Sequence, residues 1–105
     1  MSYGMTVVLR VKPGHMDQVK AIIEGLVPRV TAEEGCLAFT LYTNKDEPDT
    51  IWLYEVYVSE EYHSDVHFQY DEVKAVMEKL PEHMAAPWSI YEGETVLAMP
   101  QGVSS

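Results

Sequence analysis

Two runs of strand-forming residues, separated by one short polar segment, constrain the fold of this chain most strongly. The runs are Cys36–Thr43 (CLAFTLYT) and Ile51–Val58 (IWLYEVYV), and both are rich in aromatic and β-branched residues. The segment between them, Asn44–Thr50 (NKDEPDT), has the composition of a turn. Strands this close along the chain pair most simply with each other, so we predict an antiparallel hairpin.

A strand and an amphipathic helix flank this hairpin on each side. Before it, Met5–Val11 alternates like a strand, and His15–Thr31 carries apolar residues at three- and four-residue steps. After it, we predict a helix that begins at the N-cap Ser59 and breaks near residues 68–71, and then a strand at Trp88–Ala98. The order β-α-β-β-α-β predicts an α+β, ferredoxin-like fold with a four-stranded antiparallel sheet that carries its helices on one face.

Two residues should disturb these elements locally. Pro28 lies in the last turn of the first predicted helix, where its missing backbone donor should bend or shorten the helix. Gly93, inside the last predicted strand, is typical of a bulge or bend.

The chain is long enough for one domain with one core. It has 105 residues, of which 47% are hydrophobic and 23% are charged, as in folded globular proteins. Only the tail Gln101–Ser105 has the composition of a loose segment. We therefore predict a single domain over residues 1–105, with its core between about 5 and 98.

The charge balance and the hydropathy argue against two classes of partner. Seven Lys and Arg against seventeen Asp and Glu give a net charge of −10, which repels nucleic acids and anionic lipids. No apolar run is long enough to span a membrane, and the N-terminus lacks the pattern of a signal peptide. We expect a cytoplasmic protein that binds neither nucleic acid nor membrane.

Cysteine and histidine usage offers neither a disulfide nor a zinc site. Cys36 is the only cysteine, so we expect it to be a small buried apolar group. His63 and His67 would share one helical face, where two imidazoles could bind a metal, but the sequence shows no third ligand. We therefore predict no metal and no other cofactor.

Apolar side chains on the uncovered face of the sheet indicate an interface. Alternation along the strands places Val8, Trp52, Tyr54 and Val56 opposite the helices. A two-fold homodimer in which two sheets pack together would bury such a patch. The alternative is a monomer that tolerates an apolar surface.

Several short motifs together resemble those of the antibiotic biosynthesis monooxygenase family. They are Lys12–His15 (KPGH), Glu34–Leu37 (EGCL), Leu53–Glu55 (LYE), Tyr57 and His67. Their order and spacing extend the resemblance over about residues 5–97. It implies a homodimer whose two sheets form an α+β barrel, with one pocket per subunit between the sheet and the helices.

The resemblance implies several possible activities, because members of this family differ in what they do. Some oxidise quinols or aromatic polyketides with molecular oxygen and without metal or flavin, while others degrade haem or isomerise small signalling molecules. The positions that serve the haem-degrading branch are matched here by Val7, His67 and Met77, which disfavours haem degradation. Tyr57 stands where a Trp is usual, and Phe68–Val73 departs from the family's usual turn.

His67 and Glu55 are the candidate catalytic residues. His67 matches a pocket-lining position of the family, and an imidazole exchanges protons near neutral pH. Glu55 lies in the middle of an apolar strand, where a carboxylate is costly to bury alone. If both face the helices, a hydrogen bond between them would orient the imidazole and raise its basicity. The alternative is a polar pair that only orients helix against sheet.

Aromatic residues and a second histidine are the candidate substrate-binding residues, namely Tyr57, Phe39, Tyr91 and His63. Their rings would hold a flat phenolic or quinoid molecule. With the family resemblance, they indicate a cofactor-independent monooxygenase that oxidises a small aromatic or quinol-type substrate with molecular oxygen. A non-catalytic binder of a small apolar ligand and an isomerase of a small carbonyl compound remain alternatives.

Overall fold

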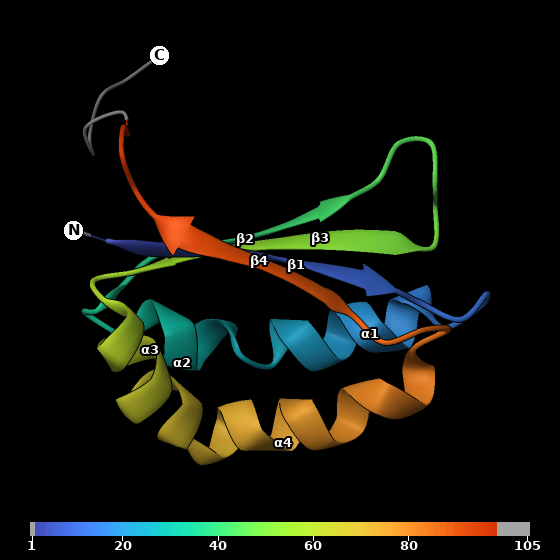
Figure 1. The fold of residues 1–105 in the computed structure, drawn as a ribbon. Helices are drawn as coiled ribbons and strands as arrows, with labels where there is room; N and C mark the ends of the chain where they lie inside the picture. The colour runs from blue at the N-terminus through green and yellow to red at the C-terminus, as the bar shows by residue number, and fades with distance from the viewer. Residues whose placement is uncertain (1, 99–105) are drawn as a thin grey trace.

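One antiparallel sheet carries all the helices on one of its faces (Figure 1). The computed structural model describes residues 2–98, so the predicted loose tail Gln101–Ser105 lies outside the described residues. The strands are β1 (Tyr3–Arg10), β2 (Cys36–Thr43), β3 (Thr50–Tyr57) and β4 (Ser89–Glu94). Their order across the sheet is β2-β3-β1-β4, and every neighbouring pair is antiparallel. The predicted ferredoxin-like fold and the predicted hairpin are confirmed.

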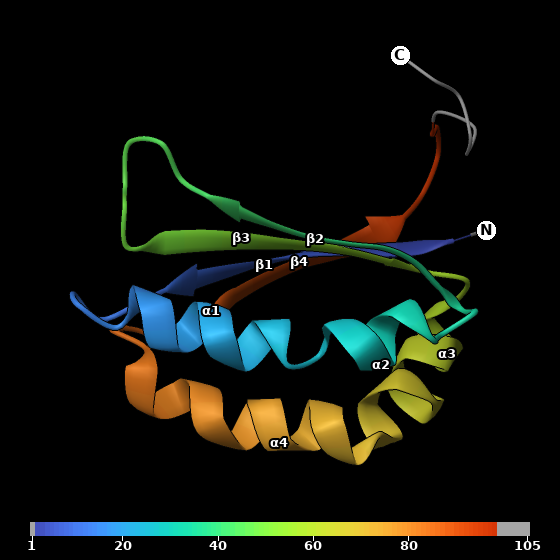
Figure 2. The ribbon, with the colours of Figure 1, turned by 180° about the vertical axis from the view of Figure 1, so that it is seen from behind.

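Both predicted helices are divided. The first forms α1 (Met16–Glu24) and α2 (Val27–Thr31), and Pro28 lies in the first turn of α2, where a missing donor costs little. The second forms α3 (Glu60–Asp65), a 3₁₀ turn η1 (His67–Gln69), α4 (Asp71–Lys79) and a final turn η2 (Leu80–His83). The view from behind shows both helical segments on the same side of the sheet (Figure 2). Among residues 2–98, no helix has both the length and the apolar character to cross a bilayer.

The starts and ends of these elements follow local chemistry. The predicted N-cap Ser59 accepts a hydrogen bond from the Tyr62 amide at 3.0 Å and so begins α3. The last strand is shorter than predicted, and its pairing with β1 runs through Gly93 without interruption, so the predicted bulge there is wrong. The register shift lies instead in β2, between Cys36 and Ala38.

The main core lies between the sheet and the helices. Alternate residues of β1 face the helices and are buried, from Tyr3 at one end to Leu9 at the other. They pack with Ile51 and Tyr57 of β3 and with Val19 of α1, which are all essentially inaccessible to solvent. This layer places the helix-facing side chains of β3 in the middle of the molecule.

The opposite face of the sheet carries large apolar side chains. No helix of residues 2–98 covers this face, on which Trp52 is 42% exposed and Tyr54 40% exposed. Val8 and Val56, which the sequence places on the same face, are already buried within one chain. The face is therefore apolar as predicted, with aromatic rings as its accessible part.

Gly35 makes room for an aromatic ring above the core. A Cβ atom at this position would overlap the ring of Tyr62. That ring stacks on Tyr57, with centroids 6.3 Å apart and an interplanar angle of 28°. The segment before β2 must therefore carry a glycine for Tyr62 to cover Tyr57.

We expect Gly35→Ala to lower the free energy of unfolding by about 1–3 kcal/mol, because the added methyl group displaces the Tyr62 ring. Chemical denaturation measures this loss. In a Tyr62→Ala background the ring is absent, so Gly35→Ala should cost little there. An equal loss in both backgrounds would contradict the explanation.

Candidate active site

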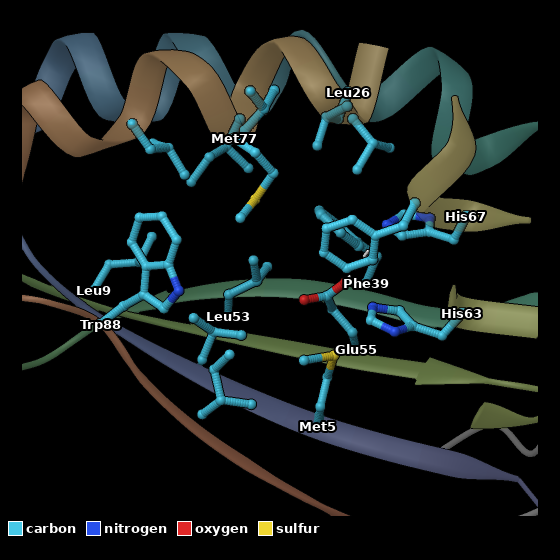
Figure 3. Close-up of a pocket in the computed structure, with 17 residues that line it drawn as sticks. Met5, Leu9, Leu26, Phe39, Leu53, Glu55, His63, His67, Met77 and Trp88 are labelled. Atoms are coloured by element: carbon cyan, nitrogen blue, oxygen red, sulfur yellow. Dashed lines mark ion pairs between the residues drawn. The ribbon is translucent and has the colours of Figure 1, made fainter. Parts of the chain in front are cut away.

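A cavity of about 80 Å³ lies between the sheet and the helices (Figure 3). Its walls are mostly apolar and include Met5, Phe39, Leu53, Met77 and Trp88. Its ionisable lining residues are Glu55, His63 and His67, which gather at one end. A mainly apolar pocket with a few converging polar groups is the usual form of a small-molecule site.

Strand alternation brings Glu55 to this cavity and places Tyr57 on the same face of the sheet. Both lie on the helix-facing side of β3, and Glu55 pairs with Met5 of β1 and Phe39 of β2. Glu55 is 6% exposed, and burial raises the pKa of its carboxyl above the usual value. One of its oxygens points toward the middle of the cavity (Figure 3).

A chain of hydrogen bonds links Glu55 to a second buried carboxylate. The Tyr57 hydroxyl donates to Glu55 Oε1 and lies 3.1 Å from His67 Nε2. On the other side of the imidazole, His67 Nδ1 lies 3.0 Å from an oxygen of Glu33. Glu55 Oε1 and His67 Nε2 are 4.0 Å apart, so the Tyr57 hydroxyl replaces the direct hydrogen bond that we predicted.

This chain is fully satisfied in two proton arrangements. In the first, Tyr57 donates to an ionised Glu55, and a doubly protonated His67 donates to the Tyr57 oxygen and to Glu33. In the second, a protonated Glu55 donates to Tyr57, Tyr57 donates to His67 Nε2, and His67 Nδ1 donates to Glu33. The two hold the same number of protons. Two proton transfers along the chain therefore interconvert them without moving a heavy atom.

Tyr57 acts in this chain as a neutral hydroxyl. Burial and the neighbouring Glu55 carboxylate raise the pKa of the Tyr57 hydroxyl, so it keeps its proton at neutral pH. Its side chain is completely buried beneath the cavity wall. Of the predicted substrate-binding residues, Tyr57 is thus placed to connect Glu55 with His67 and not to line the cavity.

His63 lies beside His67 and packs against neighbouring rings. Its ring is nearly parallel to that of His67, with centroids 5.4 Å apart, and meets Phe68 edge-on at 4.8 Å. Burial, together with the nearby His67, lowers the pKa of His63 to about 4, so the imidazole is neutral near pH 7. His63 and Phe39 both line the cavity, where the sequence placed them.

Tyr91, in contrast, lies on the other face of the sheet. The register of β4 pairs Tyr91 with Thr6 and Ile90 with Val7, so Ile90 faces the cavity. Tyr91 is 63% exposed among the rings of the open face. The sequence misplaced it because Ile90 and Tyr91 put large apolar side chains on both faces of β4.

Glu33 is the site residue that sequence reasoning missed. It follows α2 and is 5% exposed, while its neighbour Glu34 is exposed. Nothing in the pair Glu33–Glu34 marks which carboxylate turns inward. Only the tertiary contact between η1 and the segment that follows α2 brings Glu33 to His67.

Cys36 lies near this chain but is only partly buried. Burial, with the Glu33 and Glu55 carboxylates as further causes, raises the pKa of its thiol to about 11. The thiol is therefore un-ionised at neutral pH and packs with the core.

The structure brings a third candidate metal ligand, Glu55, close to the two histidines. Glu55, His63 and His67 each offer one ligand atom, and these atoms lie within 4.8 Å of one another. Among residues 2–98 this is the one such group of three.

Comparison with known proteins identifies the family. Residues 2–79 match the antibiotic biosynthesis monooxygenase family. The chain belongs to that family. The resemblance that the sequence motifs indicated is confirmed, whereas no curated protein matches this member of the antibiotic biosynthesis monooxygenases.

Solved structures of similar proteins have the same fold as this antibiotic biosynthesis monooxygenase family member. A Caulobacter crescentus CB15 protein named for the family has a TM-score of 0.84 and 25% identity, over 91% of each chain. One from Chloroflexus aurantiacus J-10-fl, with the same family name, has a TM-score of 0.82 and 25% identity, over 97% of this chain and 100% of that one. A Nitrosomonas europaea protein, also named for the family, has a TM-score of 0.84 at 19% identity, over 90% of each chain.

The pH dependence of the free energy of unfolding should reveal that Glu55 is buried. Since the folded-state pKa is raised above the unfolded value of about 4.3, Glu55 contributes stability that is present below that value. This contribution is lost as pH rises through the folded-state pKa. We expect the free energy of unfolding of Glu55→Gln, relative to that of the natural protein, to increase as pH rises above about 4 and through the folded-state pKa of Glu55.

Denaturant titrations at several pH values measure this difference. Glu34→Gln, at an exposed neighbouring carboxylate, is the control and should show little change relative to the natural protein. A difference for Glu55→Gln that does not depend on pH would contradict the raised pKa.

Proposed function

We propose that this protein is a cofactor-independent monooxygenase that oxidises a small phenolic or quinol-type molecule with molecular oxygen. The observation that carries the proposal is a buried carboxylate, Glu55, which faces an apolar cavity and is hydrogen-bonded through Tyr57 to His67. Family membership supports a monooxygenase-type role. The substrate class is our inference from the cavity and the base.

Glu55 acts as the general base in this proposal. Its cavity-facing oxygen takes the proton of the substrate hydroxyl, while Tyr57 continues to donate to the other oxygen. A carboxyl group whose pKa is raised toward neutral is a better base for this step than an ordinary one. In the first proton arrangement, the positive charge on His67 balances the negative charge that develops nearby.

Oxidation then uses electrons that the substrate itself supplies. The electron-rich phenolate passes an electron to molecular oxygen, and a carbon–oxygen bond forms between the two radicals. For a hydroquinone, loss of water from the resulting peroxide gives a hydroxyquinone, so quinol and oxygen yield hydroxyquinone and water. The apolar walls keep bulk water from the intermediates.

The cavity size limits the substrate. A volume of about 80 Å³ is well below the ~300–1,000 Å³ of typical ligand sites. A single-ring molecule fits best, with Phe39 beside its ring and the flexible side chains of Met5 and Met77 adjusting to it.

One alternative activity also has a structural argument. In the second proton arrangement Glu55 is an acid, so the chain offers both an acid and a base at one cavity. An isomerase of a small carbonyl compound needs that combination. It would move a proton between two substrate atoms and consume no oxygen.

Oxygen uptake with a panel of quinols and anthrones tests the main proposal. We expect the natural protein to consume oxygen with at least one of these compounds. Glu55→Gln should lower the rate by about 10²-fold or more, since it removes the base. Tyr57→Phe should keep some activity but shift the pH dependence of the rate, because it separates Glu55 from His67.

His83→Ala, at the opposite end of the helical layer, is the control and should retain the rate. No uptake above the Glu55→Gln background with any compound would contradict the proposal. Isomerisation of a carbonyl compound without oxygen uptake would favour the isomerase. A ligand retained in native mass spectrometry without turnover would favour a non-catalytic binder.

We also propose that two copies pack through the open face of the sheet. The rings of Tyr42, Trp52, Tyr54 and Tyr91 surround a shallow hollow there, with Thr6 and Val8 beneath them. Exposed aromatic patches of this kind are typical of interfaces. Tyr91 would then be an interface residue.

We expect light scattering after size exclusion to give the mass of a dimer for the natural protein. Trp52→Glu should give a monomer, because a charge at the centre of the patch cannot be desolvated there. Val27→Glu, at an exposed apolar position on α2, should leave the dimer intact. A monomeric natural protein would contradict the proposal.

A further inference from the structure

The ionisable end of the cavity has the composition of a metal site. We propose that Glu55, His63 and His67 form a binding site for one divalent transition-metal ion such as Zn²⁺. Their ligand atoms lie within 4.8 Å of one another, and all three side chains are buried. Two imidazole nitrogens and one carboxylate oxygen are a ligand set that binds Zn²⁺ and Fe²⁺ and leaves coordination positions open.

Only small movements are needed to close this site around an ion. Metal–ligand distances of about 2.0–2.2 Å place neighbouring ligand atoms roughly 3 to 3.5 Å apart. The ligand atoms of the three side chains lie within 4.8 Å of one another, so no pair needs an approach of more than about 2 Å. Rotation of the Glu55 carboxyl group and the His63 ring can provide it.

Two of the three proposed ligands, His67 and Glu55, already have hydrogen-bond partners of the kind that orient the ligands in metal sites. A histidine that binds a metal through one nitrogen almost always donates the other N–H to a carboxylate or carbonyl. His67 Nδ1 lies 3.0 Å from Glu33, so Nε2 is the nitrogen that would bind the ion, in exchange for its 3.1 Å contact with the Tyr57 hydroxyl. The Tyr57 hydroxyl, which donates to Glu55 Oε1, can hold that oxygen while the cavity-facing oxygen binds the ion.

His63 has no other polar role among the described residues. Its ring nitrogens make no hydrogen bond within residues 2–98, and its ring points toward Glu55 (Figure 3). Among residues 2–98, Arg29 Nε is the only buried side-chain nitrogen or oxygen without a partner, so the His63 nitrogens are not sealed off and an ion in the cavity can reach them.

A bound ion would compete with the chemistry proposed above. Coordination occupies the oxygen of Glu55 that would receive the substrate proton, so the ion should inhibit oxidation. This consequence rests on the proposed function, whereas binding of the ion does not. The remaining volume of the cavity leaves room for water to complete the coordination sphere.

Zn²⁺ titration of chelator-treated, metal-free protein by calorimetry tests the site. We expect one ion per chain and a raised melting temperature. His63→Gln should weaken binding at least tenfold. The His15 and His83 rings, whose Nδ1 atoms are 2.9 Å apart, are the other histidine pair, so His83→Ala is the matched control and should bind as tightly as the natural protein.

Co²⁺ provides a readout of the ligands themselves, because its visible absorption reports nitrogen coordination. The spectrum should lose intensity in His63→Gln and remain unchanged in His83→Ala. Should His63→Gln fail to fold, Glu55→Gln takes its place and is expected to weaken binding similarly. Absence of binding to the natural protein, unchanged affinity in the folded variant, or loss of binding in His83→Ala would overturn the proposal.

The two proposals fail in different ways. Zn²⁺ binding without any effect on oxygen uptake would overturn the inhibitory role and leave the site. If the metal-free protein consumes no oxygen, that result contradicts the monooxygenase proposal and leaves the metal-site proposal untouched.

Discussion

Glu55 is a carboxylate inside an apolar cavity, and its burial determines what its neighbours must be. Burying this carboxylate without a hydrogen-bond donor would cost several kcal/mol, so a donor must reach it. Tyr57 provides that donor from the same strand and is itself completely buried. Tyr62 covers Tyr57, and Gly35 leaves space for Tyr62. The residues from the start of β2 to the cavity thus form one packed unit.

The chain Glu33–His67–Tyr57–Glu55 places an imidazole between two acidic groups deep in the protein. Its hydrogen bonds join three parts of the fold, namely Glu33 after α2, His67 of η1, and the pair Tyr57 and Glu55 of β3. Such a network is stable only when it is complete. It therefore fixes how the two halves of the helical layer sit against the sheet, whether or not a substrate is bound.

Local sequence signals were enough to predict the sheet, the hairpin and the fact that Glu55 and Tyr57 lie on the same face of their strand. Alternation is strict in a strand, so Glu55 and Tyr57 had to share a face. The sequence did not predict which of two similar adjacent side chains faces inward, because tertiary packing decides that. Ile90 and Tyr91 are both large and apolar, and Glu33 and Glu34 are adjacent and alike, so only tertiary contacts select which one turns inward. The bridging role of the Tyr57 hydroxyl depends on distances that no spacing encodes.

β3 carries the cavity residues on one face and the exposed rings Trp52 and Tyr54 on the other. A shift of its register by a single residue would exchange the two sets completely. During evolution this strand can therefore accept many substitutions but no insertion or deletion, which would abolish the cavity and the open face together. Changes in chain length are expected to accumulate instead in the turn before it, Asn44–Asp49, which lies outside the paired residues of β2 and β3.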